Sequence, residues 1–247
     1  MSESFLPSPL LQVSGIVKRF GGFRALDGVD LTVAAGEIVG LIGPNGSGKT
    51  TFINVVSGLL PADGGTVKVG GIAVTTLPAH QRVGRGINRT FQVPKPFSSL
   101  TVRQNLEVAS HGAQGPADLD ALLDSVELGG ATARRLAGEL TSAQQKMLDL
   151  ARALATRPRL LLVDELACGF NPAELEHVAA RLRALAESGL GLVVVEHLMP
   201  FIDRITHRVV VMNAGRAIFG GSLREAIRDR QVIEVFLGEA DPVAEVA

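Results

Sequence analysis

The stretch Gly43-Pro44-Asn45-Gly46-Ser47-Gly48-Lys49-Thr50 is the most informative pattern in this 247-residue chain. It matches the P-loop pattern, a glycine followed by four residues and then Gly-Lys-Thr, without a gap. An apolar run, Ile38–Ile42, precedes it, and the segment Thr51–Val56 that follows resembles a helix. This order of strand, glycine loop and helix suits phosphate binding, because backbone N–H groups and the helix N-terminus both face the anion.

The loop predicts a site for ATP and Mg²⁺. We expect Lys49 to reach the β- and γ-phosphates and the Thr50 hydroxyl to ligate the metal ion. A chance glycine-rich turn is the alternative, and the flanking strand and helix disfavour it. The predicted nucleotide-binding residues of this segment are Gly43, Pro44, Asn45, Gly46, Ser47, Gly48, Lys49, Thr50 and Thr51.

Composition excludes several classes of protein. The net charge of −1 and the absence of Trp and Tyr argue against a nucleic-acid-binding face. The longest apolar runs are too short to cross a bilayer, and the first residues have no signal-peptide pattern. A single cysteine, Cys168, excludes an internal disulfide and is typical of a reducing compartment. We therefore expect a cytoplasmic protein that could serve a membrane only by docking on embedded partners.

Three nearly continuous apolar runs predict the central sheet. Ile38–Ile42, Leu160–Val163 and Leu192–Val195 have the pattern of parallel strands buried on both faces. Each run ends in polar residues: the P-loop, then Asp164-Glu165, then Glu196-His197. Ligands of open α/β sheets bind at the carboxyl ends of the strands, so these three segments are expected to converge on one phosphate site.

The residues at these strand ends are the candidate catalytic groups. Asp164 is expected to hold Mg²⁺, and Glu165 to polarise an attacking water, although the pair could instead be helix N-caps. His197 is expected to hydrogen-bond the γ-phosphate, although a lone histidine is more often structural. Gln92 lies in a loop at the entrance to a helical region, where it could contact Mg²⁺ or water, or remain a solvated side chain. Phe20 could stack on adenine or pack in the core.

The rest of the chain predicts two further parts. The short, glycine-punctuated segments Val13–Val17, Leu31–Val33 and Thr66–Val74 predict an antiparallel β layer beside the nucleotide. Apolar residues at helical spacing, such as Met147, Leu150, Ala151 and Leu154, predict a helical insert over residues 93–157. Near the end, residues 208–219 read as a hairpin and residues 232–237 as a last helix. We expect one domain over residues 1–247 that contains this insert.

Taken together, these motifs resemble an ATP-binding cassette (ABC) subunit over nearly the whole chain. The P-loop resembles the Walker A motif, Gln92 the Q-loop, Leu160–Glu165 the Walker B strand with its catalytic glutamate, Gly169–Pro172 the D-loop, and Glu196-His197 the switch histidine. Phe20 falls where the family places its adenine-stacking aromatic residue. The fold implied is α/β, a P-loop NTPase core of the ABC ATPase type with an antiparallel β layer and a helical subdomain.

The amino-acid sequences of four segments are similar to those of branched-chain amino acid importers. They are Lys18–Gly22, Gly86–Gln92, Val195–Met199 and Glu234–Gly238, and urea and amide importers and the lipopolysaccharide-export ATPase share much of them. The resemblance implies an ATP-hydrolysing subunit at the cytoplasmic face of a membrane, in a head-to-tail dimer with a second cassette. It also implies membrane permease partners and, indirectly, a solute-binding protein. The catalytic residues it implies are Glu165, His197, Lys49 and Gln92, with Thr50, Gln92 and Asp164 at the metal.

Two positions depart from the family pattern. The signature, Leu-Ser-Gly-Gly-Gln or Leu-Ser-Tyr-Gly-Gln, is here Leu140-Thr141-Ser142-Ala143-Gln144. Thr141 keeps a hydroxyl, but Ala143 places a Cβ where glycine lets backbone approach a phosphate. Leu166 replaces the proline that usually follows the catalytic glutamate, a change expected to affect only the local turn.

Two alternatives of different classes remain open. A non-transport ABC ATPase of DNA repair or translation usually carries two cassettes or a long coiled-coil insert, neither of which is present here. A regulatory module that holds ATP without turnover would agree with the altered signature but not with the intact Glu165.

Overall fold

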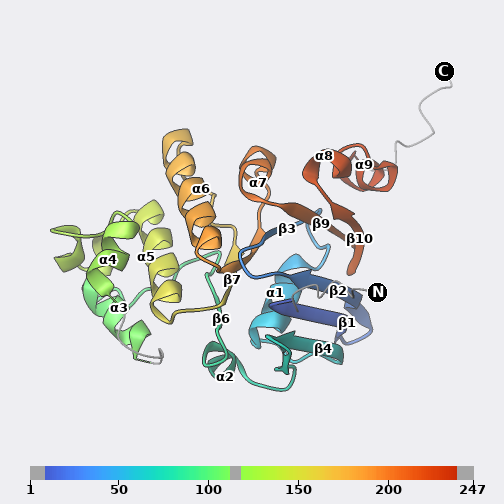
Figure 1. The fold of residues 1–247 in the computed structure, drawn as a ribbon, viewed down its shortest axis with the longest axis horizontal. Helices are drawn as coiled ribbons and strands as arrows, with labels where there is room; N and C mark the ends of the chain where they lie inside the picture. The colour runs from blue at the N-terminus through green and yellow to red at the C-terminus, as the bar shows by residue number, and fades with distance from the viewer. Residues whose placement is uncertain (1–8, 112–117, 238–247) are drawn as a thin grey trace, which may run out of the picture.

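The computed structural model describes residues 9–111 and 118–237, which form two β-sheets and a set of surrounding helices (Figure 1). The first sheet is antiparallel and has the strand order β2-β1-β4-β5. Its strands are β1 (Leu11–Phe20), β2 (Phe23–Val33), β4 (Gly64–Val69) and β5 (Ile72–Ala73). The expected N-terminal layer is confirmed, with β1 and β2 longer than predicted. The expected single strand Thr66–Val74 was wrong, because Gly70 and Gly71 adopt left-handed conformations and form a turn between β4 and β5.

A bulge in β1 explains why its apolar pattern changes phase. Leu11 and Val13 point into the core at alternate positions, but the next core residue is Ile16 rather than residue 15. Gly15 has φ +59°, and the pairing register of β1 shifts between Val13 and Ile16. An extra residue in the left-handed conformation defines such a bulge, so Gly15 returns Ile16 to the buried face.

The second sheet carries the P-loop and has the strand order β10-β9-β3-β8-β7-β6. All of its pairings are parallel except the one between β9 and β10, which form the predicted hairpin. Its strands are β3 (Ile38–Ile42), β6 (Ile87–Arg89), β7 (Leu160–Asp164), β8 (Gly191–Val195), β9 (Arg208–Asn213) and β10 (Arg216–Gly221). The three apolar runs therefore form strands of a largely parallel sheet, as the sequence predicted. Their order as the neighbours β3, β8 and β7 was not part of that prediction.

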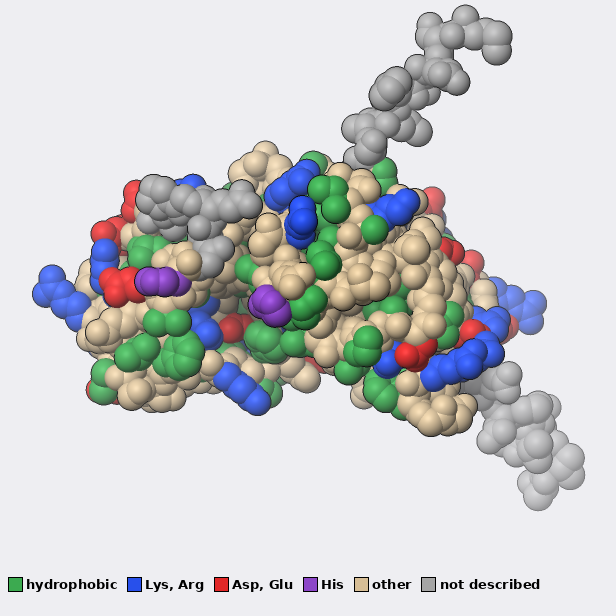
Figure 2. Space-filling model, turned by 90° about the horizontal axis from the view of Figure 1, so that it is seen from below, with side chains coloured by type: hydrophobic (Ala, Val, Ile, Leu, Met, Phe, Trp, Pro, Cys, Tyr) green, Lys and Arg blue, Asp and Glu red, His purple; other side chains and the backbone are tan. Residues whose placement is uncertain are grey.

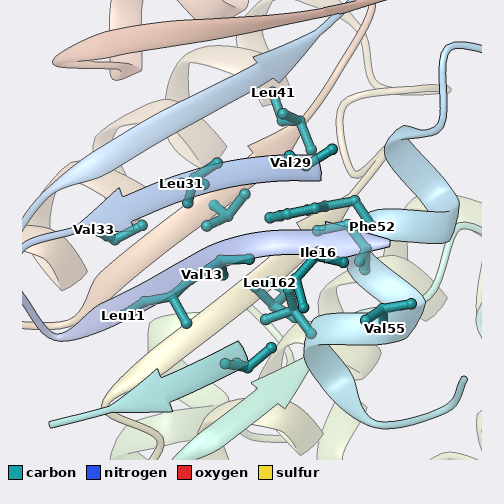
Figure 3. Packing of buried hydrophobic residues seen from close by; sticks show 14 of the residues in the cluster. Leu11, Val13, Ile16, Val29, Leu31, Val33, Leu41, Phe52, Val55 and Leu162 are labelled. Atoms are coloured by element: carbon teal, nitrogen blue, oxygen red, sulfur yellow. The ribbon is translucent and has the colours of Figure 1, made fainter. Parts of the chain in front are cut away.

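The three central strands are apolar at consecutive positions because both faces of this sheet are covered. Leu162 of β7 packs with Val13, Phe52 and other residues in the core between the two sheets and helix α1 (Lys49–Ser57), as Figure 3 shows. The adjacent Val163 faces the opposite core, which contains apolar residues of α6 (Pro172–Glu187) and α7 (Met199–Ile205). Successive strand residues point to opposite faces, so a strand covered on both sides needs an unbroken apolar run.

A separate group of helices lies between β6 and β7 in the chain and forms its own core. It contains α3 (Val102–Ser110), α4 (Leu119–Ser125), α5 (Ser142–Ala155) and the 3₁₀ turns η1 (Thr132–Arg134) and η2 (Ala137–Glu139). In Figure 1 these helices stand apart from the sheets, on the far side of α6. Residues 112–117 of this region lie outside the described part of the chain. The other helices are α2 (Ala79–Val83), α8 (Leu223–Ala226) and α9 (Arg230–Leu237), the last confirming the predicted final helix.

Arg82 joins α2 to the end of the P-loop helix. Arg82 is 1% exposed. Its guanidinium group donates to the carbonyl oxygens of Val55 and Val56 at 2.7 and 2.8 Å. It also donates to the carbonyl oxygens of Leu77 and Thr75 at 2.8 and 2.7 Å. The last carbonyls of a helix have no partner within the helix, so Arg82 satisfies two such groups of α1. Helix α1 carries Lys49 at its other end, which links this interaction to the P-loop.

We expect Arg82→Met to lower the free energy of unfolding by about 3 kcal/mol, because buried carbonyls lose charged hydrogen-bond donors. Denaturant unfolding of the purified chain measures this change. Arg85→Met is the matched control, since Arg85 lies three residues away and is exposed. Equal unfolding midpoints for the two variants would contradict the structural role assigned to Arg82.

Candidate active site

The P-loop connects β3 to α1, and two of its glycines are required by close backbone contacts. A Cβ on Gly43 would lie 2.2 Å from the carbonyl oxygen of Met212, and one on Gly48 would lie 2.7 Å from that of Ala25. Both glycines have positive φ, +149° and +106°. Gly48 precedes the first residue of α1, so the helix N-terminus opens directly at the loop. The local fold thus has the shape and the donor groups of an anion site.

Polar groups of the loop are held inside it. The Lys49 ammonium donates to the carbonyls of Gly43 and Pro44 at 2.8 and 3.0 Å, and Lys49 is 6% exposed. Burial lowers the pKa of Lys49, while the nearby carboxylates of Glu165 and Asp164 raise it. Ser47 Oγ is buried and has no hydrogen-bond partner among the described residues. A buried hydroxyl of this kind is suited to an arriving phosphate oxygen.

Glu165 lies between Gln92 and His197. Gln92 Nε2 donates to Glu165 Oε2 at 2.6 Å, and His197 Nε2 lies 3.1 Å from Glu165 Oε1. These residues follow β6, β7 and β8, which are neighbours in the sheet, and so their side chains meet at the same edge. The structure therefore brings together Glu165 and His197, which the sequence placed at strand ends, and Gln92, which it placed in a loop. Glu165 does not act as a helix N-cap, since α6 begins after Asn171.

The backbone of Glu165 adopts a conformation that is uncommon for a residue with a side chain. Its φ is +48°, in the left-handed region. Such conformations cost on the order of 1–3 kcal/mol and persist where the surrounding structure holds them. Leu166, in the position where the family pattern has proline, is 2% exposed and packs in the core with the helices α6 and α7. The turn after β7 is thus fixed by packing as well as by hydrogen bonds.

Asp164 is buried and paired with Arg89, a contact that the sequence analysis missed. Arg89 Nη2 donates to Asp164 Oδ2 at 2.9 Å, and Arg89 Nη1 donates to Asn54 of α1. Burial raises the pKa of Asp164, the positive charge of Arg89 opposes that rise, and Glu165 adds to it. Arg89 precedes Gln92 by three residues, so the ion pair also anchors the loop that carries Gln92.

Glu196 is also a buried carboxyl group, and the sequence assigned it no role of its own. Its Oε1 accepts the N–H of Ala167 at 2.6 Å. Burial raises the pKa of Glu196 to about 7, against the lowering effect of hydrogen bonds from Ala167 and His197 and of the Lys146 charge. The only sequence signal for it was its place directly before His197.

Two aromatic side chains border the P-loop cavity. Phe20 and Phe23 are 49% and 64% exposed, and both line the cavity together with the P-loop, Glu165 and His197. They flank the tight turn between β1 and β2. Phe23 was not predicted, although an aromatic residue on the other side of the same Gly21-Gly22 turn was an available signal. A pair of exposed aromatic rings beside a phosphate loop suits a flat base.

The signature segment lies apart from this cavity. Thr141 is the N-cap of α5, and its hydroxyl accepts the N–H of Gln144, whose side chain accepts the N–H of Thr141 in return. Ala143 and Gln144 line a different cavity, beside α6. The N–H groups at the first two positions of a helix have no acceptor within it, so the backbone N–H groups of Ser142 and Ala143 have no partner inside α5. The cavity beside α6 and the P-loop cavity have no lining residue in common.

The residues named for a metal ion supply oxygen donors. Thr50 contributes a hydroxyl, Gln92 an amide oxygen and Asp164 a carboxylate. Mg²⁺ prefers such hard ligands and keeps several waters, so it needs only one or two protein carboxylates. Among the described residues no cluster of three or more His, Cys, Asp or Glu side chains could hold a metal. The donor set fits Mg²⁺ better than a transition metal.

The fold and the site define a P-loop nucleotide hydrolase. A comparison with known families matches residues 26–167 to the family described as ABC transporter. A branched-chain amino acid transport ATP-binding protein, BraF of Pseudomonas aeruginosa, is 37% identical, with 94% of this chain and 99% of the relative aligned. LivG of Escherichia coli, with the same description, is 35% identical over 95% of this chain and its own full length.

Solved structures agree with this assignment. A nucleotide-free ATP-binding cassette of an ABC transporter superposes with a TM-score of 0.84 at 31% identity, covering 94% of this chain and 100% of that one. A dimeric cassette in a post-hydrolysis state with ADP and Pi superposes with a TM-score of 0.78 at 26% identity, covering 87% of this chain and 99% of its own.

The chain therefore belongs to the ABC transporter family. It is an ATP-binding ATPase with the ABC ATPase fold that the sequence resemblance implied. Across the two described ranges, no helix has both the length and the apolar character that crossing a membrane requires.

Proposed function

We propose that this chain is the ATP-hydrolysing subunit of an importer for branched-chain amino acids or related amides. The similarity to BraF and LivG, which extends over almost all of this chain, carries the proposal. Both relatives are described as transport proteins, which does not favour an ATPase of DNA repair or translation. The subunit would work at the cytoplasmic face of a membrane, bound to permease subunits and served indirectly by a solute-binding protein.

Hydrolysis would occur by in-line attack of water on the γ-phosphate. Glu165 would polarise the water, and the contacts with Gln92 and His197 keep its carboxylate in place for this role. Lys49 would leave the loop carbonyls and bind the β- and γ-phosphates, while the P-loop N–H groups bind the remaining oxygens. His197 would position the γ-phosphate, and Phe20 would stack on the adenine.

The residues that would hold Mg²⁺ are Thr50, Asp164 and Gln92. A bound Mg²⁺ neutralises the charge that develops on the phosphate oxygens. Asp164 has one oxygen engaged by Arg89, so its other oxygen is the one available to a metal or to a metal-bound water. Burial disfavours the charged form of Asp164, and the positive charges of Arg89 and Lys49 favour it. A bound Mg²⁺ would favour the charged form further, which supports this placement.

The substrate class is tested by transport rather than by hydrolysis alone. The complex with its permeases, reconstituted in vesicles with its binding protein, is expected to take up leucine with ATP and to leave urea and acetamide outside. Uptake of urea or acetamide in place of leucine would move the assignment to the amide importers. ATP turnover that no binding protein stimulates would count against an importer.

The separation of the signature from the P-loop supports a head-to-tail dimer with a second cassette. The N–H groups of Ser142 and Ala143 would then face the partner's nucleotide, as they face no phosphate site in their own chain. If the partner is a different cassette, the two nucleotide sites are unequal. The site built on Lys49 and Glu165 of this chain would receive the partner's signature and perform most of the turnover.

We expect Ala143→Gly to raise turnover at the partner's site. A lost preorganised donor costs on the order of 3 kcal/mol in a transition state, and glycine lets the backbone N–H approach the phosphate more closely. The measurement is ATPase activity of a complex whose Glu165 is replaced by glutamine, so that only the partner's site works. Equal transport losses from Glu165→Gln and from the same change at the partner's equivalent glutamate, with no gain from Ala143→Gly, would show that the altered signature is fully functional.

A docking face for a membrane subunit would lie where the helical region meets the core. We propose that residues 93–157 form a subdomain and that its start contacts a permease. Phe91, Val93 and Phe97 are exposed. Figure 2 shows one face of the molecule, on which hydrophobic side chains are interspersed with charged and other residues. Arg152 of α5 donates to the carbonyl of Lys95 and lies 5.4 Å from the Phe97 ring centre, so this loop is tied to the helices.

Crosslinking tests this docking face. Cys168 is exposed and must first be replaced by serine. A cysteine introduced at Ser99, which is exposed two residues after Phe97, is expected to crosslink to a cytoplasmic loop of the permease. Thr32→Cys, exposed in the antiparallel sheet, is the control and should not crosslink. Crosslinks that arise only from Thr32→Cys would show that the docking face is wrong.

A further inference from the structure

The ammonium group of Lys146 lies against the loop that carries Glu165. Lys146 is in the second turn of α5 and is 7% exposed. Its Nζ donates to the carbonyl oxygens of Glu165 at 2.7 Å, Leu166 at 3.3 Å and Cys168 at 2.7 Å. An ammonium group has three donors, so all of them are directed at this one stretch of main chain.

The same loop is held from the sheet. The N–H of Glu165 donates to the carbonyl of Val195 at 2.9 Å, and the N–H of Ala167 donates to the Glu196 carboxyl group at 2.6 Å. The carbonyl groups of the loop are thus fixed by α5, while its N–H groups are fixed by the end of β8. Lys146 is the side chain that connects the helix to this loop.

Glu165 is the residue that needs this support. Its left-handed backbone conformation is unfavourable for a residue with a Cβ, and it persists only because neighbouring groups determine it. Its own carbonyl is one of the two oxygens nearest to Lys146 Nζ. Without that contact the left-handed conformation of Glu165 would lose one of its supports, and the carboxylate could leave its place between Gln92 and His197.

We infer that Lys146 is a positioning residue for hydrolysis, which acts by holding the main chain of Glu165 so that its carboxylate faces the attacking water. The inference rests on the function proposed above for Glu165. Because α5 begins with Thr141 and the signature residues, the same contact ties the placement of the carboxylate to the position of the signature helix.

Steady-state ATPase kinetics of the full chain provide the test. Lys146→Met keeps an unbranched apolar stem and removes the donors, and it is expected to lower kcat about 10- to 100-fold, since small displacements of a catalytic group have such effects. The KM for ATP is expected to change by less than about two-fold, because the P-loop is untouched. Lys146→Arg retains a cation with several donors and is expected to restore most of the turnover. Lys68→Met, in the antiparallel sheet, is the matched control.

A double-mutant comparison separates positioning from a general loss of structure. If Lys146 acts only through Glu165, adding Lys146→Met to Glu165→Gln should reduce kcat no further. Independent, multiplying losses would overturn the inference, as would wild-type kcat in Lys146→Met. If Glu165→Gln itself leaves turnover unchanged, the proposed role of Glu165 fails. A slow Glu165→Gln beside a fully active Lys146→Met refutes the role of Lys146 alone.

Loss of folding in Lys146→Met does not prevent the test, because the arginine and glutamine variants can be compared directly. Lys146→Gln keeps a polar side chain with two N–H donors and is expected to have a lower kcat than Lys146→Arg. Equal kcat values in these two variants, at the wild-type level, would overturn the inference.

Discussion

Replacing Lys49 with alanine is expected to abolish ATP hydrolysis and to weaken ATP binding sharply. Lys49 is the cation that the P-loop itself places next to Gly43 and Pro44, and the change removes its charge from the β- and γ-phosphates. Removing one such electrostatic group costs on the order of 100- to 1000-fold in turnover. Hydrolysis measured by phosphate release, and ATP binding measured by equilibrium dialysis, check the two parts of this prediction.

The control for Lys49→Ala is Lys68→Ala, which removes the same charge from the partly exposed strand β4. Equal unfolding midpoints in denaturant for wild type and Lys49→Ala would show that the loop still folds. Turnover of the purified Lys49→Ala protein at the wild-type rate would refute the assignment of the nucleotide site.

The second large effect is expected from Glu165→Gln, which should bind MgATP but hydrolyse it at least about 100-fold more slowly, the usual contribution of a positioned general base. Glutamine has almost the same shape as glutamate, so its amide oxygen can still accept from Gln92, and the backbone is expected to keep its conformation. What is lost is the negative charge that polarises the water. Single-turnover hydrolysis and an ATP-binding measurement separate these two properties.

The same variant is expected to accumulate as an ATP-bound dimer. In the head-to-tail dimer proposed above, closure around ATP would end in cleavage, and without cleavage the closed state would persist. Gel filtration with and without MgATP measures this change, and Glu187→Gln, exposed at the end of α6, is the control. A monomer in MgATP together with unchanged turnover would contradict the proposed role of Glu165 in hydrolysis.

The parts of the fold that the sequence predicted are those with a local pattern. Both faces of strands β3, β7 and β8 are covered by apolar cores. Strands of this kind have nearly continuous apolar sequences, so the sequence pattern alone predicted them. The antiparallel layer was predicted without its correct ends, since the turn between β4 and β5 depends on the conformations of Gly70 and Gly71. The strand order was not predictable from the pattern, because pairing joins strands that are far apart in the chain.

The site follows the same division. Lys49, Glu165 and His197 could be named from the sequence because each comes directly after a predicted buried strand or lies within a recognised motif. Arg89, Phe23 and Glu196 could not be assigned roles in this way. Arg89 reaches Asp164 across 75 residues of chain, and Glu196 reaches Ala167 across 29, so nothing near them in the sequence identifies their partners.

By itself, the sequence determined the family of this chain and predicted a phosphate site at the P-loop, with candidate catalytic residues at named strand ends. These features depend on residues that are consecutive in the chain. The order of glycines, apolar residues and polar residues is enough to predict the loop, the buried strands and the start of α1. Only the tertiary structure decided how Glu165 is held, with its backbone at φ +48°, its carbonyl on Lys146 and its carboxylate between Gln92 and His197. These contacts join distant segments, and a buried lysine or glutamate gains its role from the groups that the fold places around it.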